Sequence, residues 1–239
     1  MLIRDKISYI FEKLIRTIYP EHCPVCDKLI PLNEDYCSCS RDISEQLGDD
    51  YCRHCGQNKE HCSCFAENSF FLPDVAGVYY YGGRVRADIL NLKFNNSKKI
   101  AVKLGSDMAM RCASVYCDVD FDAVSFMPMT KSAYLKRGYN QSQLLAKQVS
   151  KMLFVPSEQL FEKIKDTSAQ HNLTGKQRAE NLRDSVVIKP GVSVEGKTVL
   201  LCDDVKTTGA TLSQCVKLLE DAGAKKVCCI CVAVTKYEA

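Results

Sequence analysis

The chain has 239 residues, a hydrophobic fraction of 46% and a formal net charge of +3. This length favours one large domain plus a small one, because single domains typically hold ~100–200 residues. The small net charge gives no bulk electrostatic reason to favour a nucleic-acid partner. No run approaches the ~20 apolar residues of a membrane-spanning helix, so we do not expect an integral membrane protein.

The first predicted element is an amphipathic helix at residues 1–19. Apolar residues recur there at three- and four-residue steps, and Pro20 ends the pattern. The simplest interpretation is a helix that packs on the rest of the protein, although its basic face would also suit a partner or a membrane surface. Charged residues interrupt the segment, so it lacks the apolar region of a secretory signal. We therefore predict a cytoplasmic protein.

The next segment, residues 20–67, is rich in cysteine and poor in apolar residues. In a reducing compartment, paired cysteines are more often metal ligands than disulfides. Two thiolate pairs complete one tetrahedral zinc site, so four pairs suit two structural zinc ions that would stabilise this segment. The predicted ligands are Cys23, Cys26, Cys37, Cys39, Cys52, Cys55, Cys62 and Cys64.

Several alternatives stay open for this segment. Two of the pairs have one intervening residue instead of two, and disulfides, redox chemistry or an iron–sulfur cluster are the alternatives to zinc. His22, His54 and His61 lie beside cysteines, so a histidine could replace a thiolate. The regular His61-x2-Cys64 spacing makes His61 the first candidate. The spacing does not decide which pairs share an ion.

The remainder, residues 68–239, predicts one α/β domain with a parallel sheet, because strand and helix patterns alternate along it. Isolated cysteines in these elements are expected to be buried apolar fillers. The segment from 128 to 139 is expected to be a loop. The predicted strands are 75–81, 123–127, 197–202 and 227–234, and the predicted helices are 84–94, 99–117, 140–152 and 210–222.

The most informative stretch is VLLCDDVKTTGATL at residues 199–212. Two acids at the end of a strand can accept hydrogen bonds from the vicinal hydroxyls of a ribose. Amides and threonine hydroxyls at the start of a helix can bind a phosphate, and open α/β sheets bind ligands at this edge. The stretch therefore predicts a sugar-phosphate site made by Asp203, Asp204, Val205, Lys206, Thr207, Thr208, Gly209, Ala210 and Thr211.

This stretch resembles the phosphoribosyl pyrophosphate signature of type I phosphoribosyltransferases, which is an apolar run, two acids and Thr-Thr-Gly-x-Thr. Two further elements are similar to those of the ComF family, which is associated with bacterial competence and begins with zinc knuckles. They are RGYNQ at 137–141 and the Thr-x2-Gln to Arg-x2-Asn segment at 167–181. The resemblance covers essentially the whole chain. It implies a type I phosphoribosyltransferase fold, a Rossmann-like parallel sheet flanked by helices, with a small N-terminal zinc-ribbon domain.

The resemblance also implies roles for individual residues. Asp203 and Asp204 would be the catalytic pair that holds the ribose hydroxyls, and residues 207–211 would bind the 5′-phosphate of phosphoribosyl pyrophosphate. Lys131 and Arg137 would face pyrophosphate and Mg²⁺, an ion that prefers phosphate oxygens and water to an all-protein cage. Both basic residues could equally be solvated surface charges.

A third group of residues would form a flexible cover over the site, made by Gln170, Arg178 and Asn181. Lys163 and Lys165 stand where the family commonly has an arginine, and Val186 stands near an expected phenylalanine. These departures weaken the family resemblance of the cover segment more than that of the phosphate loop.

The implied function is a phosphoribosyltransferase-like protein that takes part in DNA uptake during natural transformation. Its implied partners are phosphoribosyl pyrophosphate, single-stranded DNA and competence helicase or recombination-mediator proteins, which could bring it to the inner face of the membrane. A nucleobase-salvage phosphoribosyltransferase and a non-catalytic sensor of phosphoribosyl pyrophosphate are the alternatives, because no acceptor motif is recognisable. The zinc segment favours the competence role, since base salvage does not need such a module.

Overall fold

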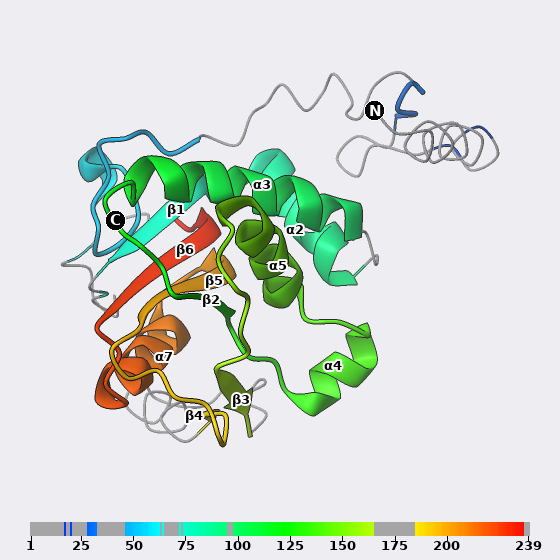
Figure 1. The fold of residues 1–239 in the computed structure, drawn as a ribbon. Coiled ribbons are helices and arrows are strands. Elements are labelled where there is room, and N and C mark those ends of the chain that lie inside the picture. The colour runs from blue at the N-terminus through cyan, green and yellow to red at the C-terminus, as the bar shows by residue number, and fades with distance from the viewer. Residues whose placement is uncertain are drawn as a thin grey trace, which may run out of the picture.

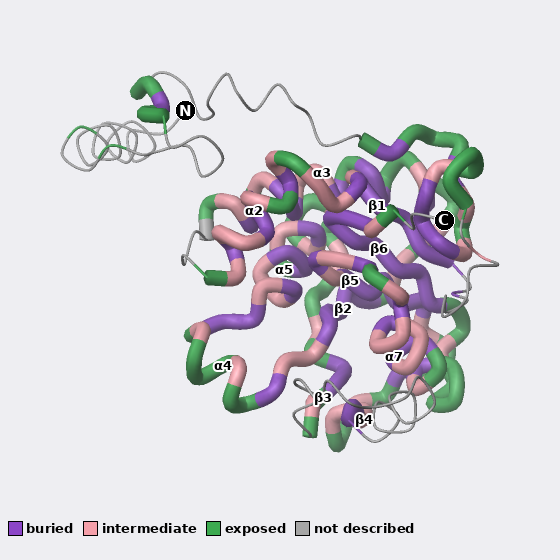
Figure 2. The backbone as a smooth tube through the Cα atoms, turned by 180° about the vertical axis from the view of Figure 1, so that it is seen from behind, coloured by how far each residue is buried: buried purple, intermediate pink, exposed green. Residues whose placement is uncertain are grey.

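The core of the computed structural model is a parallel sheet of four strands, β1 (Val75–Tyr80), β6 (Lys226–Val234), β5 (Thr198–Lys206) and β2 (Ala123–Phe126), paired in that order (Figure 1). The structure describes residues 17, 20, 28–32, 46–62, 64, 72, 74–94, 98–164 and 185–236. The central strands β5 and β6 are rich in valine, leucine, isoleucine and cysteine and are almost wholly buried (Figure 2). Such continuous apolar runs are typical of parallel strands that are covered on both faces.

Helices cover both faces of the sheet, as Figure 1 shows. On one face, α2 (Gly83–Phe94), α3 (Lys98–Val115) and α5 (Gln141–Leu153) share one buried cluster with the sheet. On the other face, α7 (Ala210–Asp221) buries Leu212, Cys215, Val216 and Leu219 in a second cluster. The predicted α/β fold with a parallel sheet flanked by helices is therefore confirmed. The isolated cysteines of β5, β6 and α7 are buried in these clusters, as expected.

The structure corrects the sequence prediction for the segment from 128 to 139, which was expected to be a loop. Residues Lys131–Arg137 form the helix α4. Thr130 begins this helix, because its hydroxyl oxygen accepts a hydrogen bond from the backbone N–H of Ala133 at 3.3 Å. Gly138 ends it in the left-handed region with a φ of 81°. The helix has only seven residues and buries none of its side chains, so no apolar period marks it in the sequence.

A small antiparallel pair of strands, β3 (Phe161–Lys163) and β4 (Val186–Ile188), was not predicted. Each strand has only three residues, which is too short for an alternating pattern to stand out. Phe161 and Val186 anchor the pair in the buried cluster beneath α7. The pair therefore lies against the same face of the sheet as α7.

The cysteine-bearing segment 46–64 packs against the edge strand β1 of the sheet. The backbone N–H of Leu47 donates to Val78 O at 2.9 Å, and that of Val75 donates to Arg53 O at 2.7 Å. Leu47, Tyr80 and Val234 form a small buried cluster at this contact. Hydrogen bonds and apolar burial thus attach this segment to β1 and β6. It also contains the short 3-10 helix η2 (Lys59–His61).

Two other predictions concern the helix at residues 1–19 and the absence of a membrane-spanning helix. Apart from Thr17, the predicted helix at 1–19 lies outside the described residues. Within the described part of the chain, no helix has the length and apolar character needed to cross a membrane.

Candidate functional site

The two adjacent acids of the key stretch lie inside β5. The predicted strand ended at Cys202, but β5 continues to Lys206 because β6 runs parallel beside it and pairs Asp203 with Cys231 and Val205 with Ala233. On its other side β5 loses its neighbour earlier, since β2 ends at Phe126. The acids therefore stand at the carboxyl edge of the sheet, where one neighbouring strand has already ended.

Each acid has partners from the helices on the α2–α5 face. The Asp204 side chain is 7% exposed, and its Oδ2 lies 2.8 Å from the ammonium of Lys93 in the last turn of α2. The Ser142 hydroxyl, in the first turn of α5, donates to Asp203 Oδ1 at 3.1 Å. The backbone N–H of Asp204 donates to the same oxygen at 2.8 Å. Helices α2 and α5 thus orient both carboxylates.

Lys93 and Ser142 are site residues whose roles the sequence prediction missed. Lys93 and Ser142 lie far from Asp203 and Asp204 in the sequence, so no local pattern indicates that these residues are in contact.

The electrostatics of the pair favour a proton on Asp203. Burial is the main reason why the pKa of Asp203 is raised, and the negative charge of Asp204 adds to it. The backbone N–H of Asp204, the Lys93 ammonium and the Ser142 hydroxyl lower this pKa but do not cancel the increase. Asp203 therefore keeps its proton to a higher pH than an exposed aspartate does.

The turn after β5 exposes the start of α7. Gly209 is the N-cap residue with a φ of 85° and has no side chain to offer the first turn of the helix, whose first backbone N–H, that of Ala210, donates to the Thr208 hydroxyl oxygen at 3.4 Å. Thr208 and Thr211 are half-buried and Thr207 is exposed, so hydroxyl groups surround these backbone amides. A helix start with uncapped amides attracts anions, because the amides and the helix dipole both favour negative charge. The predicted phosphate-loop residues thus lie together between the acids and α7.

Asn140 connects the end of β2 to the start of α5. Its side-chain oxygen accepts hydrogen bonds from the backbone N–H groups of Ser142 at 2.9 Å and Gln143 at 3.4 Å, and its amide donates to Met127 O at 2.9 Å. This cap holds Ser142 in place beside Asp203. It explains in physical terms why an asparagine follows the Arg-Gly-Tyr sequence.

The structure separates the two basic residues that were expected to face pyrophosphate. Lys131 is exposed at the start of α4 and lines a cavity of about 650 Å³. The guanidinium of Arg137 donates to Gln141 Oε1 and lies 5.5 Å from the centre of the Phe94 ring. Arg137 therefore fixes α4 against α2 and α5, and it does not line the cavity.

The cavity lies between the end of β2, α4 and β3. Its wall combines aromatic and apolar groups with hydroxyls, amides and charges. The lining residues are Phe126, Pro128, Met129, Thr130, Lys131, Ser132, Tyr134, Leu135, Asn140, Gln143, Gln159, Phe161, Glu162, Lys163 and Ile164.

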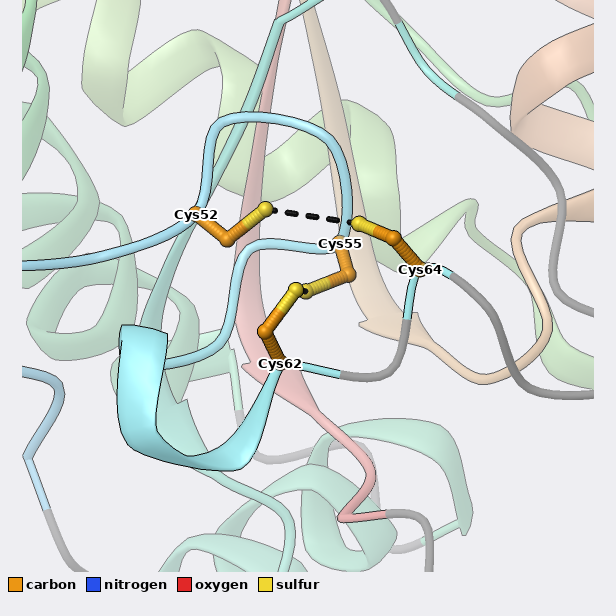
Figure 3. Close-up of side chains that lie close together, drawn as sticks. All are labelled: Cys52, Cys55, Cys62 and Cys64. Carbon is orange, nitrogen blue, oxygen red and sulfur yellow. Dashed lines mark hydrogen bonds between the residues drawn. The ribbon is translucent and has the colours of Figure 1, made fainter.

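Four cysteines meet in a second cluster, in the 46–64 segment that packs against β1. The sulfur atoms of Cys52, Cys55, Cys62 and Cys64 all lie within 4.8 Å of one another (Figure 3). The Cys52 and Cys64 sulfurs are 3.4 Å apart, and those of Cys55 and Cys62 are 3.9 Å apart. A tetrahedral Zn²⁺ with bonds of ~2.3 Å needs sulfurs about 3.8 Å apart, so this donor set fits a zinc ion.

This cluster brings the third and fourth cysteine pairs together and does not include His61, which the sequence left open as an alternative ligand. Cys62 contributes the sulfur, whereas His61 Nδ1 lies 3.1 Å from the Tyr80 hydroxyl oxygen and the two rings meet edge to face. His54 Nδ1 lies 2.9 Å from Leu72 O and is also outside the cluster. Both histidines therefore attach the cysteine segment to its surroundings.

The Cys52 thiol is suited to metal binding. Burial raises its pKa, but hydrogen bonds from the backbone N–H groups of Cys55 and His54 and from neighbouring thiols outweigh this effect and lower its pKa to about 7. The thiolate is the form that binds metal.

Other predicted residues lie outside the described part of the chain. They are Cys23, Cys26, Cys37 and Cys39 of the first two cysteine pairs, and Gln170, Arg178 and Asn181 of the expected cover.

Residues 138–238 match the phosphoribosyl transferase domain. The chain is 28% identical to Competence protein F of Haemophilus influenzae over 186 residues, covering 74% of this chain and 81% of that protein. It is 26% identical to the DNA utilization protein YhgH of Salmonella typhimurium over 225 residues, covering 89% and 97%. It is 27% identical to Competence protein ComFC of Streptococcus pneumoniae over 208 residues, covering 83% and 88%.

Among solved structures, the chain is similar to the allosteric regulatory enzyme of purine biosynthesis at a TM-score of 0.39 and 24% identity. The match covers 55% of this chain and 25% of that one.

Proposed function

Because the chain belongs to the ComF family of phosphoribosyltransferase-like competence proteins, we propose that it binds phosphoribosyl pyrophosphate with Mg²⁺ at the carboxyl end of β5. One observation carries this proposal, which is that a short Thr-Thr-Gly turn leads from the Asp203–Asp204 pair to the start of α7, whose N-cap residue Gly209 has no side chain. A ligand with vicinal hydroxyls and a phosphate on one sugar would satisfy both features.

The orientation of the ligand follows from the chemistry of each part. The two carboxylates would accept hydrogen bonds from the ribose hydroxyls, and Lys93 and Ser142 would keep them in place. The amides and hydroxyls of residues 207–211 would hold the 5′-phosphate, since helix starts favour anions. The protein carboxylates also suit a hard cation, and Mg²⁺ would be held mainly by ligand oxygens and water when it screens the charge of pyrophosphate.

The cavity beside α4 favours a transferase over a sensor, because a sensor needs no second pocket. Its volume of about 650 Å³ suits a small organic molecule. In the transfer, the bond from the anomeric carbon to pyrophosphate breaks and pyrophosphate leaves with the electron pair. An acceptor nucleophile then forms a new bond to that carbon. The protein would position both partners and stabilise the developing charge, with Lys131 as a cation on the cavity wall.

We also propose that the protein acts in the cytoplasm on incoming single-stranded DNA during natural transformation. The support comes from the names of its relatives, which are competence proteins and DNA utilization proteins. Contacts with the DNA backbone would weaken steeply with salt. Mobility-shift assays with single-stranded DNA at low and high salt test this role, and no shift at low salt would contradict it.

Isothermal titration calorimetry with phosphoribosyl pyrophosphate and Mg²⁺ tests the binding site. The double variant Asp203→Asn/Asp204→Asn should bind at least ~100-fold more weakly, because hydrogen bonds to charged groups contribute about 1.5–3 kcal/mol each. Asp118→Asn/Asp120→Asn is the matched control, since both of these acids are exposed. Equal affinity in the two double variants would reject the site.

A further inference from the structure

The Tyr139 hydroxyl reaches the last turn of α2, one residue before Lys93. It donates a hydrogen bond to the backbone oxygen of Leu92. Both residues are buried and belong to the cluster that the sheet shares with α2, α3 and α5. Tyr139 does not line the cavity beside α4, so its contact with α2 is a separate feature of the structure.

The Leu92 carbonyl needs a donor from outside its own helix. The last four carbonyls of an α-helix have no partner within the helix, and α2 ends at Phe94. A buried carbonyl without a hydrogen bond is costly, because it has lost its interactions with water. The Tyr139 hydroxyl supplies the donor, and it therefore fixes the last turn of α2 relative to the segment that leads into α5.

A second contact from the same segment holds the residue that follows Lys93. The Arg137 guanidinium lies 5.5 Å from the centre of the Phe94 ring. Phe94 is 70% exposed, so water competes with this contact more than with the buried hydrogen bond of Tyr139. The segment thus contacts both sequence neighbours of Lys93, and Tyr139 provides the more constrained of the two contacts.

Lys93 connects the last turn of α2 to the acid pair. Its ammonium lies 2.8 Å from Asp204 Oδ2, and both side chains are largely withdrawn from water. A lysine side chain is long and flexible, so the position of its ammonium depends on how firmly its backbone is held. A contact that fixes the backbone beside Lys93 therefore also fixes the charge that faces the acids.

We propose that Tyr139 is a positioning residue of the acid pair, because its hydroxyl fixes the last turn of α2 and thereby holds the Lys93 ammonium against Asp204. The next residue, Asn140, caps α5 and so orients Ser142, which is the partner of the other acid. Carboxylates that are already oriented lose less freedom when they accept the hydroxyls of a ribose. This effect on ligand binding rests on the proposed site for phosphoribosyl pyrophosphate, whereas the effect of Tyr139 on Lys93 does not.

The titration of Asp203 reports the position of Lys93 without any ligand. Among the described residues, the groups that face Asp203 include Lys93 of α2, Ser142 of α5, Cys202 and Asp204 of β5, Cys215 of α7 and Cys231 of β6. Burial raises the pKa of these three thiols, so they are uncharged near pH 7. Lys93 supplies the positive charge of this set, and its displacement would favour the protonated form of Asp203.

Titration of the Asp203 carboxyl by ¹³C NMR tests the positioning role. Lys93→Met should raise the midpoint by about 1 pH unit, because a nearby opposite charge is lost. Tyr139→Phe removes only the hydroxyl and should give a smaller shift in the same direction, but no further shift when added to Lys93→Met. Tyr116→Phe is the matched control, since its buried hydroxyl also donates to a backbone oxygen, that of Cys229 at 2.9 Å. The control should lose similar stability and keep the original midpoint, which separates positioning from general loosening of the core.

Calorimetry with phosphoribosyl pyrophosphate and Mg²⁺ tests the consequence for binding. Tyr139→Phe should bind about 5-fold more weakly than the unaltered protein, and the same change should cause no further loss in Lys93→Met. An Asp203 midpoint in Tyr139→Phe that stays at the original value, or that shifts equally in Tyr116→Phe, would overturn the positioning role. Unchanged affinity in Tyr139→Phe would overturn the consequence for binding. If the unaltered protein binds no ligand, the proposed function fails, while the NMR titration still decides the role of Tyr139.

Discussion

The Lys93 ammonium lies 2.8 Å from Asp204 Oδ2, joining the last turn of α2 to the centre of the proposed ribose site. Lys93 is 23% exposed and Asp204 is 7% exposed, so this ion pair is largely withdrawn from water. Removing one partner of such a pair leaves the other charge uncompensated. Breaking this ion pair should therefore lower the stability of the fold, in addition to disturbing the proposed ribose site.

We expect Lys93→Met to lower the free energy of unfolding by about 1–3 kcal/mol, because Asp204 would lose its buried counter-charge. Urea denaturation measures this change. Combining Lys93→Met with Asp204→Asn should recover part of the loss, whereas Lys147→Met, at an exposed site on α5, should have little effect. Additive effects of Lys93→Met and Asp204→Asn would show that the two residues do not interact.

The stability of the protein should depend on pH through Asp203. Its pKa in the folded protein is raised to about 7, above the ordinary value of ~3.9. Between these values the folded state keeps a proton that the unfolded state has released. The contribution of Asp203 to stability therefore falls as the pH rises through this window.

Asp203→Asn lacks this titration. Relative to the unaltered protein, its free energy of unfolding should rise by about 2 kcal/mol from pH 5 to pH 7 and level off above the folded pKa. Urea denaturation at several pH values measures the difference. The exposed control Asp118→Asn should give a difference that does not vary with pH, and a flat profile for Asp203→Asn would contradict the raised pKa.

Metal analysis distinguishes the thiol of Cys62 from the ring of His61. Cys62→Ser should lose about one zinc ion per chain, because a tetrahedral site needs all four sulfurs. His61→Ala should keep that ion and lower stability by about 1 kcal/mol through its lost contact with Tyr80. Zinc loss in His61→Ala with retention in Cys62→Ser would reverse the assignment.

Two glycines, Gly77 inside β1 and Gly82 just after it, test how tightly the cysteine segment is packed. Gly77→Ala should lower the free energy of unfolding by about 1–3 kcal/mol, because the new Cβ would overlap Leu47 and Val234. Gly82→Ala is the control, since a Cβ there meets nothing within 4 Å. Thermal unfolding compares the two, and equal melting temperatures would mean that the packing is loose.

The sequence predicted the parallel sheet and its main helices well, because their apolar runs and turn residues are long and regular. It misjudged the end of β5, since acids usually follow a strand and the pairing of Asp203 with Cys231 depends on the distant β6. Helix α4 was missed because it has no buried face. These errors share one cause, which is that tertiary contacts extend or replace the local pattern.

For the site, the motif placed Asp203, Asp204 and the Thr-Gly turn together, and the structure has them adjacent. The partners Lys93 and Ser142 come from helices far away in the sequence, so only the fold brings them to the acids.

The central claim is that β5 and the start of α7 form a binding site for phosphoribosyl pyrophosphate. A crystal structure of the protein grown with phosphoribosyl pyrophosphate and Mg²⁺ tests it most directly. We predict the ribose hydroxyls at the carboxylates of Asp203 and Asp204, and the 5′-phosphate at the backbone amides of residues 208–211. Ligand bound elsewhere, with these carboxylates and amides not contacting it, would contradict the account.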